Sequence, residues 1–115
     1  MTERLHPSVV DYFRNQMEGH SLVARCVIFR LNDGLAARIS RTSGMRDVKV
    51  LLSAAYEFTT MDYLNRPSEI SRGCYILIAR LESTFTTEAW EAASNDGVGL
   101  GNISDLKGAI NLEDV

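Results

Sequence analysis

The sequence contains little cysteine and proline, and it has no long apolar run. Its 115 residues include two cysteines and two prolines. Two cysteines are too few for the framework of a disulfide-stapled mini-protein. The longest apolar runs fall far short of the ~18 residues that a membrane-spanning helix needs. The N-terminal stretch MTERLHPSVVDYF lacks the basic and apolar regions of a secretion signal. We therefore expect a cytoplasmic protein without a membrane partner.

The sequence also lacks the local signatures of common catalytic and cofactor sites. It contains no G-x-S-x-G, H-E-x-x-H or C-x-x-C motif and no P-loop. Its two histidines, His6 and His20, flank the first predicted helix, whereas a serine nucleophile would need one of them as its base. The cysteines, Cys26 and Cys74, show no paired metal-ligand spacing with either histidine. We expect no catalytic residue, no metal and no cofactor, which favours a protein that is not an enzyme.

The composition is that of an ordinary globular domain. Hydrophobic residues make up 45% of the chain and charged residues 23%, a balance that excludes an intrinsically disordered protein. A chain of this length buries roughly 65% of the surface that its unfolded form exposes, which is enough for one core. The sequence predicts a single α+β domain over residues 1–115. Its sheet is expected to be antiparallel, with three to four strands and with helices packed on one face.

Two extended segments joined by a tight turn form the clearest pattern. Residues 21–31 are rich in β-branched and aromatic side chains, and Asn32-Asp33-Gly34 separates them from a second extended run. An Asp-Gly turn between two such runs predicts a β-hairpin over residues 21–42, with Gly34 at positive φ.

Three further segments have helical or extended patterns. Residues 8–18 predict a helix that begins at a Ser8 cap and ends at Gly19. Residues 48–64 fit either a strand or a helix. We favour a helix, because no glycine or proline interrupts the segment and strands typically run about 4–8 residues. Residues 73–83 predict a strand that is central in the sheet or covered on both faces.

The C-terminal third contains a short predicted helix followed by a glycine-rich stretch. Thr86 predicts the N-cap of that helix. Residues 95–115 predict a flexible, glycine-rich and acidic segment, with weak helical character from Ser104.

The net charge of −3 conceals an asymmetry along the chain. Residues 1–80 carry 11 basic and 8 acidic side chains, whereas residues 81–115 carry one basic and seven acidic side chains. An acidic surface of this kind suits a basic site on a partner protein. We therefore predict a partner-binding surface formed by Glu82, Glu88, Glu91 and Asp96.

The basic residues suggest a second, weaker site. A possible anion patch consists of Arg38, Arg41, Arg46 and Lys49. No aromatic residue is interleaved with these four, and the isoelectric point of about 5.3 argues against a nucleic-acid partner. Ten of the twelve basic residues are arginine, which indicates either contact chemistry or the codon bias of a GC-rich genome.

The absence of a catalytic constellation favours a binding function. We expect a non-catalytic protein-binding module that occupies a partner's surface, of the small cytosolic inhibitor, immunity or phage-encoded anti-defence type. One alternative is a small-molecule-binding domain or enzyme with a pocket between sheet and helices. The other is a self-assembling structural subunit.

The pattern of apolar residues also predicts a homodimer. The predicted strands 21–31 and 73–83 are apolar on both faces, and an uncovered apolar face usually marks an interface. The alternative is that residues 48–64 and the C-terminal segment together cover the second face.

Overall fold

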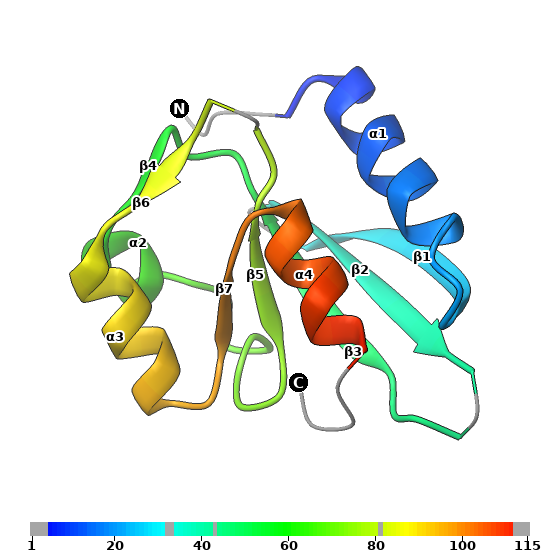
Figure 1. Cartoon of the computed structure of the whole chain (residues 1–115). Coiled ribbons are helices and arrows are strands. Elements are labelled where there is room, and N and C mark those ends of the chain that lie inside the picture. Colours follow the sequence, from blue (N-terminus) through cyan, green and yellow to red (C-terminus); the bar gives the residue numbers. More distant parts are fainter. Residues whose placement is uncertain (1–4, 32–33, 43, 81, 112–115) are drawn as a thin grey trace.

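The computed structural model describes residues 5–31, 34–42, 44–80 and 82–111. In chain order the elements are α1 (Pro7–Glu18), β1 (Val23–Leu31), β2 (Gly34–Arg41), β3 (Val48–Ser53), β4 (Glu57–Phe58), α2 (Thr60–Leu64), β5 (Tyr75–Ile78), β6 (Thr84–Phe85), α3 (Thr87–Asn95), β7 (Gly99–Gly101) and α4 (Ile103–Ile110). Figure 1 shows their arrangement. None of the helices in these ranges is long and apolar enough to cross a membrane.

The α+β class is confirmed, but the sheet differs from the expected one. It has five strands in the order β1-β2-β3-β5-β7. The first two pairings are antiparallel, and the pairs β3·β5 and β5·β7 are parallel. A parallel pair needs a crossover connection, and the segments that contain α2 and α3 supply the two crossovers. A separate parallel pair joins β4 to β6.

The expectation that helices cover one face was wrong, because helices lie on both. Alternate residues of β3 enter different cores: Val50 packs in one core and Leu51 in the other. The first core contains Phe13 of α1 and Leu106 of α4, and the second contains Tyr63 of α2. In Figure 1, α1 and α4 lie on the near side of the sheet. Both faces of the central strands are therefore covered within one chain, and the expected uncovered apolar face is not present among the described residues.

The hairpin is confirmed, whereas the predicted conformation of Gly34 was wrong. Strands β1 and β2 pair over their length, and Leu31 faces Gly34 at the turn end. Gly34 is the first residue of β2, and it is not among the glycines with positive φ. The Asp-Gly pattern located the connection between the two strands, but residues 32–33 of that pattern lie outside the described residues.

The helix favoured for residues 48–64 was also wrong. Residues 48–53 form β3, and only Thr60–Leu64 are helical, behind a capping box made by Thr59 and Asp62. The apolar residues of β3 point alternately into the two cores, so both faces of this strand are buried. A strand that is buried on both faces loses the alternating pattern by which strands are recognised.

The remaining N-terminal and central predictions hold with small shifts. Helix α1 ends at Gly19 as expected, but the side chain of His6, not Ser8, accepts the capping hydrogen bond. Strand β5 covers Tyr75–Ile78, is buried throughout and lies between β3 and β7. The predicted N-cap Thr86 accepts a hydrogen bond from the backbone N–H of Ala89.

Two regular elements occupy the segment that was expected to be flexible. Residues 99–101 form β7, and residues 103–110 form α4, whose Leu106 and Ile110 are buried. The helix begins at Asn102, which forms a capping box with Asp105. At Gly99 a Cβ atom would overlap the ring of Tyr75, so glycine is what lets β7 approach β5 closely.

Candidate protein-binding surface

Helix α3 presents one buried side and one exposed side. Ala89 and Ala93 pack completely into the second core. Thr87, Trp90, Glu91 and Ser94 are all exposed, at the spacing i, i+3, i+4, i+7. Residues at this spacing line one side of a helix. Because small alanines hold the helix against the sheet, its larger side chains are left on the outside.

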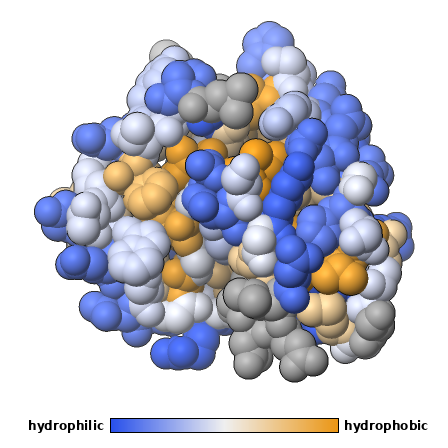
Figure 2. Space-filling model, viewed as in Figure 1, coloured by the Kyte–Doolittle hydropathy of each residue, from blue (hydrophilic) through white to orange (hydrophobic). Residues whose placement is uncertain are grey.

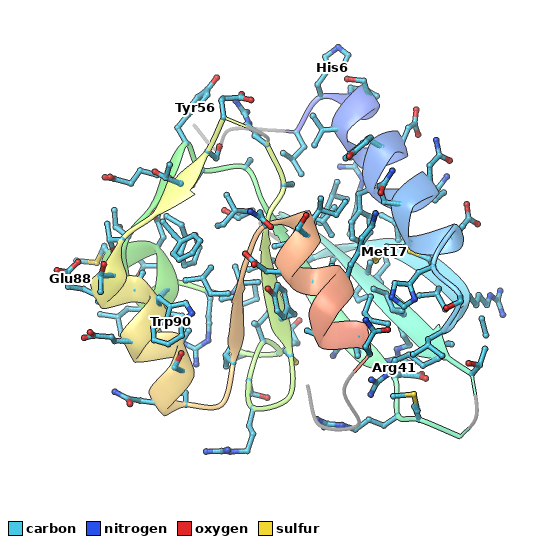
Figure 3. The ribbon with its side chains drawn as sticks, viewed as in Figure 1. His6, Met17, Arg41, Tyr56, Glu88 and Trp90 are labelled. Atoms are coloured by element: carbon cyan, nitrogen blue, oxygen red, sulfur yellow. The ribbon has the colours of Figure 1, made fainter. Side chains whose placement is uncertain are left out.

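Trp90 is the most notable residue on this exposed side. Its surface is 48% exposed, and it projects from α3 in Figure 3. The adjacent helix α2 carries Met61 and Leu64, each 64% exposed. Trp90, Met61 and Leu64 were not predicted as site residues. The spacing of the polar residues around Trp90 was the signal in the sequence that could have shown the outward side of α3.

Glu88 and Glu91 are both exposed on α3, so two of the four predicted acidic residues lie on the helix that carries Trp90. Glu82 is exposed in the loop before β6. Asp96 is exposed at the C-cap of α3. The four residues are thus distributed from the loop before β6 to the C-cap of α3.

Asp96 differs from the three glutamates because it belongs to a hydrogen-bonded network. The hydroxyl of Tyr63 donates to Asp96 Oδ2 at 2.5 Å, and Arg66 Nη2 lies 4.0 Å from the same oxygen. The Arg66 guanidinium lies over the Tyr63 ring, 4.0 Å from its centre. Burial, together with the hydrogen bond to Asp96, raises the pKa of Tyr63 to about 12. This network joins the end of α3 to α2.

Of the four residues of the predicted anion patch, Arg41 lies away from Arg38 and Lys49. Arg38 and Lys49 are cross-strand neighbours on β2 and β3. The side chain of Arg41 is buried, and it donates to the backbone carbonyls of Arg46 and Ile110. Arg41 thereby ties β2 to the end of α4.

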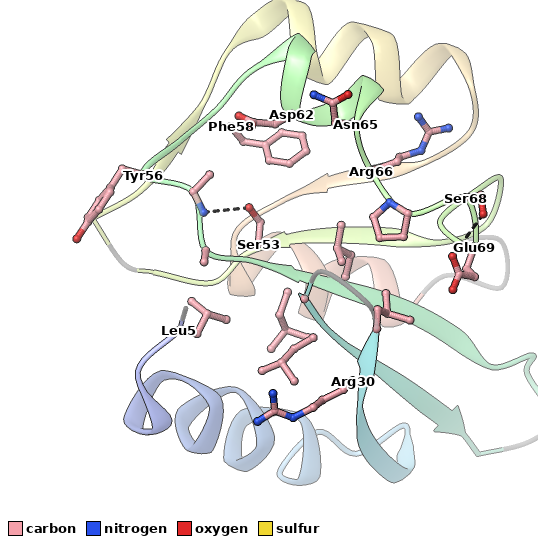
Figure 4. A pocket seen from close by; sticks show the side chains of 18 of the residues that line it. Leu5, Arg30, Ser53, Tyr56, Phe58, Asp62, Asn65, Arg66, Ser68 and Glu69 are labelled. Carbon is pink, nitrogen blue, oxygen red and sulfur yellow. Dashed lines mark hydrogen bonds between the residues drawn. The ribbon is translucent and has the colours of Figure 1, made fainter. Parts of the chain in front are cut away.

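A groove lies at the C-terminal end of β3, with a volume of about 990 Å³. Figure 4 shows side chains of β3, α2 and the chain after α2 around it. Two of its charged groups already have partners within the fold: Asp62 closes the capping box with Thr59, and Arg66 donates to the carbonyls of Tyr63 and Ile70. These groups hold α2 and the following turn in place.

The histidines and cysteines do not form a site with one another in the described part of the chain. His20 Nδ1 accepts from the N–H of Leu22, and its Nε2 lies 3.3 Å from the carbonyl of Lys107, which links the start of β1 to α4. Cys26 and Cys74 are both unpaired thiols. Within the described residues, no cluster of three or more histidine, cysteine and acidic side chains could hold a metal.

The chain matches no protein-family model, no curated protein and no solved structure at a significant level. A functional assignment therefore depends on the geometry of the chain itself.

Proposed function

We propose that the protein is a non-catalytic protein-binding module that occupies the surface of a basic partner through α3. The observation that carries this proposal is the exposure of Trp90 on a helix that also presents Glu88 and Glu91. Tryptophan is enriched among the residues that contribute most to binding at protein interfaces. Acidic neighbours suit a partner whose contact surface is basic.

Other exposed apolar side chains support the proposal. Met61 and Leu64 add exposed apolar side chains on the neighbouring helix α2. Figure 2 shows apolar side chains in the seam between α3 and α4, with hydrophilic side chains around it. Interfaces typically combine an apolar centre with a polar rim. The Tyr63–Asp96 hydrogen bond joins α2 to the end of α3, and a contact that orders a surface before binding lowers the entropic cost of association.

The main alternative is a ligand site in the groove at the end of β3. Its volume of about 990 Å³ is sufficient for a small molecule. However, Asp62 and Arg66, two of its charged groups, are engaged by the fold. The groove therefore supports catalysis or specific ligand recognition less well than α3 supports protein binding.

The test is affinity enrichment from cells of the native host with three versions of the tagged protein. The wild type is compared with Trp90→Ala and with the control Tyr12→Ala, which removes an aromatic side chain 43% exposed on α1. We expect one protein to co-purify with the wild type and with Tyr12→Ala. Affinity of the purified partner for Trp90→Ala should fall by at least ~30-fold, the effect of losing a dominant contact. A partner retained equally by all three versions would overturn the assignment of α3.

A further inference from the structure

We propose that the protein forms a two-fold homodimer in which β1 of one copy pairs antiparallel with β1 of another. This proposal does not rest on the function proposed for α3, and it concerns the opposite edge of the sheet. Strand β1 is the first of the five strands in spatial order and pairs only with β2 among the described residues. Its backbone from residue 24 to 31 makes no hydrogen bond to other described residues outside that pairing.

Strand β1 has the features of an edge strand that accepts another strand. It is nine residues long, and residues 23–31 contain only two charged side chains, Arg25 and Arg30. None of its residues is fully buried, whereas half of the eight residues of β2 are. Val27, at its centre, is 41% exposed. Protected edges are usually short, or they carry prolines, bulges and many charges. The one irregularity of β1 lies between Val23 and Arg25, at its start.

The symmetry of two identical strands selects the register. A two-fold axis normal to the sheet places one residue opposite its own copy, because side chains opposed across an antiparallel pair must share a face. The irregularity between Val23 and Arg25 breaks the alternation, because Val23 packs with Cys26 and Ile28 whereas Leu31 joins the other core, so regular pairing extends over residues 25–31. Only a centre at Ile28 pairs all seven of these residues. Arg25 then faces Leu31 of the second copy, Cys26 faces Arg30 and Val27 faces Phe29. No two like charges are opposed in this register.

The other edge of the sheet explains why assembly stops at two copies. Strand β7 is only three residues long, so addition of β1 to β7 of another copy would pair at most three residues. Pairing of β1 with β1 uses the same strand of both copies and closes the assembly. Because α3 packs on β7 and not on β1, the dimer leaves two copies of the α3 surface free for partners.

The test is the solution mass of the wild type and of two variants, by light scattering at micromolar concentration. We expect a wild-type mass of twice 12.8 kDa. Val27→Lys places one ammonium group of each copy beside the two-fold axis and should give 12.8 kDa, with the circular dichroism spectrum of the wild type. Met61→Lys adds the same charge at an exposed site on α2 and should remain dimeric. A wild type of 12.8 kDa, or a dimeric Val27→Lys, would overturn the proposal.

A disulfide test covers the case in which Val27→Lys fails to fold. In a Cys26→Ser background, Ile28→Cys places one thiol opposite its copy on the axis and should cross-link under mild oxidation. Arg30→Cys in the same background faces position 26 and should not cross-link directly to its copy. Equal cross-linking of both variants, or none for Ile28→Cys, would exclude the register centred on Ile28.

Discussion

The hydroxyl of Tyr63 donates a hydrogen bond to Asp96 at 2.5 Å, across 33 residues of sequence. Tyr63 of α2 is almost fully buried, and Asp96 is the exposed C-cap of α3. The contact therefore holds the two helices of the proposed binding surface in one arrangement. Tyr63→Phe keeps the ring and removes only the hydroxyl. We expect it to lower the free energy of unfolding at neutral pH by about 1–3 kcal/mol, as for a hydrogen bond to a charged group. Urea denaturation measures the difference.

The raised pKa of Tyr63 predicts a loss of stability in alkali. The unfolded chain releases this proton near pH 10, whereas the folded chain keeps it until about pH 12. The stabilisation is thus fully present below pH 10 and is lost as pH rises from 10 to 12. Burial also raises the pKa of Tyr75, so Tyr63→Phe should show a smaller loss over this range, but not a flat profile. Identical pH profiles for Tyr63→Phe and the wild type would contradict the role given to this hydroxyl.

Replacement by alanine should destabilise the fold at Gly99 but have little effect at Gly34. At Gly99 a Cβ atom would overlap the ring of Tyr75, and the buried packing between β5 and β7 would have to shift. We expect Gly99→Ala to lower stability by about 1–3 kcal/mol, the usual cost of overpacking. At Gly34 the space is open and φ is not positive, so Gly34→Ala should change stability by less than about 0.5 kcal/mol. Thermal melting of the two variants checks the contrast, which an equal loss at both sites would refute.

The parts of the fold that the sequence predicted are those encoded by local chemistry. The Asp-Gly turn located the hairpin, and Thr86 located the start of α3, because both signals act within a few residues. Strand β3 was missed because its side chains are buried on both faces, which removes the alternation of apolar and polar residues. Strand β7 was missed because two of its three residues are glycines. The reason for glycine at position 99, the ring of Tyr75 lying where a Cβ atom would be, is visible only in the structure.

The candidate site was predicted in the same partial way. Charge counting pointed to the acidic residues around α3, since charge is visible without a fold. Counting could not distinguish Asp96, which is bonded to Tyr63, from the exposed Glu88 and Glu91. Trp90 was missed because its exposure depends on which side of α3 faces the core. The two buried alanines, not the tryptophan, make that side. Arg38 and Arg41 lie on opposite faces of β2, because successive side chains of a strand alternate between its faces. This separation could be predicted only once residues 34–41 were known to form a strand.

Reversal of the acidic charges should slow binding without unfolding the protein. The change is Glu82→Lys, Glu88→Lys and Glu91→Lys together, at three exposed positions. We expect a lower association rate with the basic partner and a weaker dependence of that rate on salt, because steering by charge is lost. Stopped-flow or surface-binding kinetics at two salt concentrations measure both quantities. As a control, Asp11→Lys and Glu18→Lys together, two reversals on α1, should leave the association rate close to that of the wild type. Unchanged kinetics for the triple variant would show that the acidic surface only keeps the protein dispersed.

The central claim, that α3 is the contact surface for a partner protein, is tested most directly by photo-cross-linking at position 90. Trp90 is replaced by the photoreactive amino acid benzoylphenylalanine in the native host, and Tyr12 on α1 is replaced in a parallel strain. Both positions are exposed aromatic sites, so the two probes differ only in the surface that they report. The account predicts one discrete cross-linked product from position 90 and none of the same mass from position 12. Products of equal yield from both positions, or a product from position 12 alone, would contradict it.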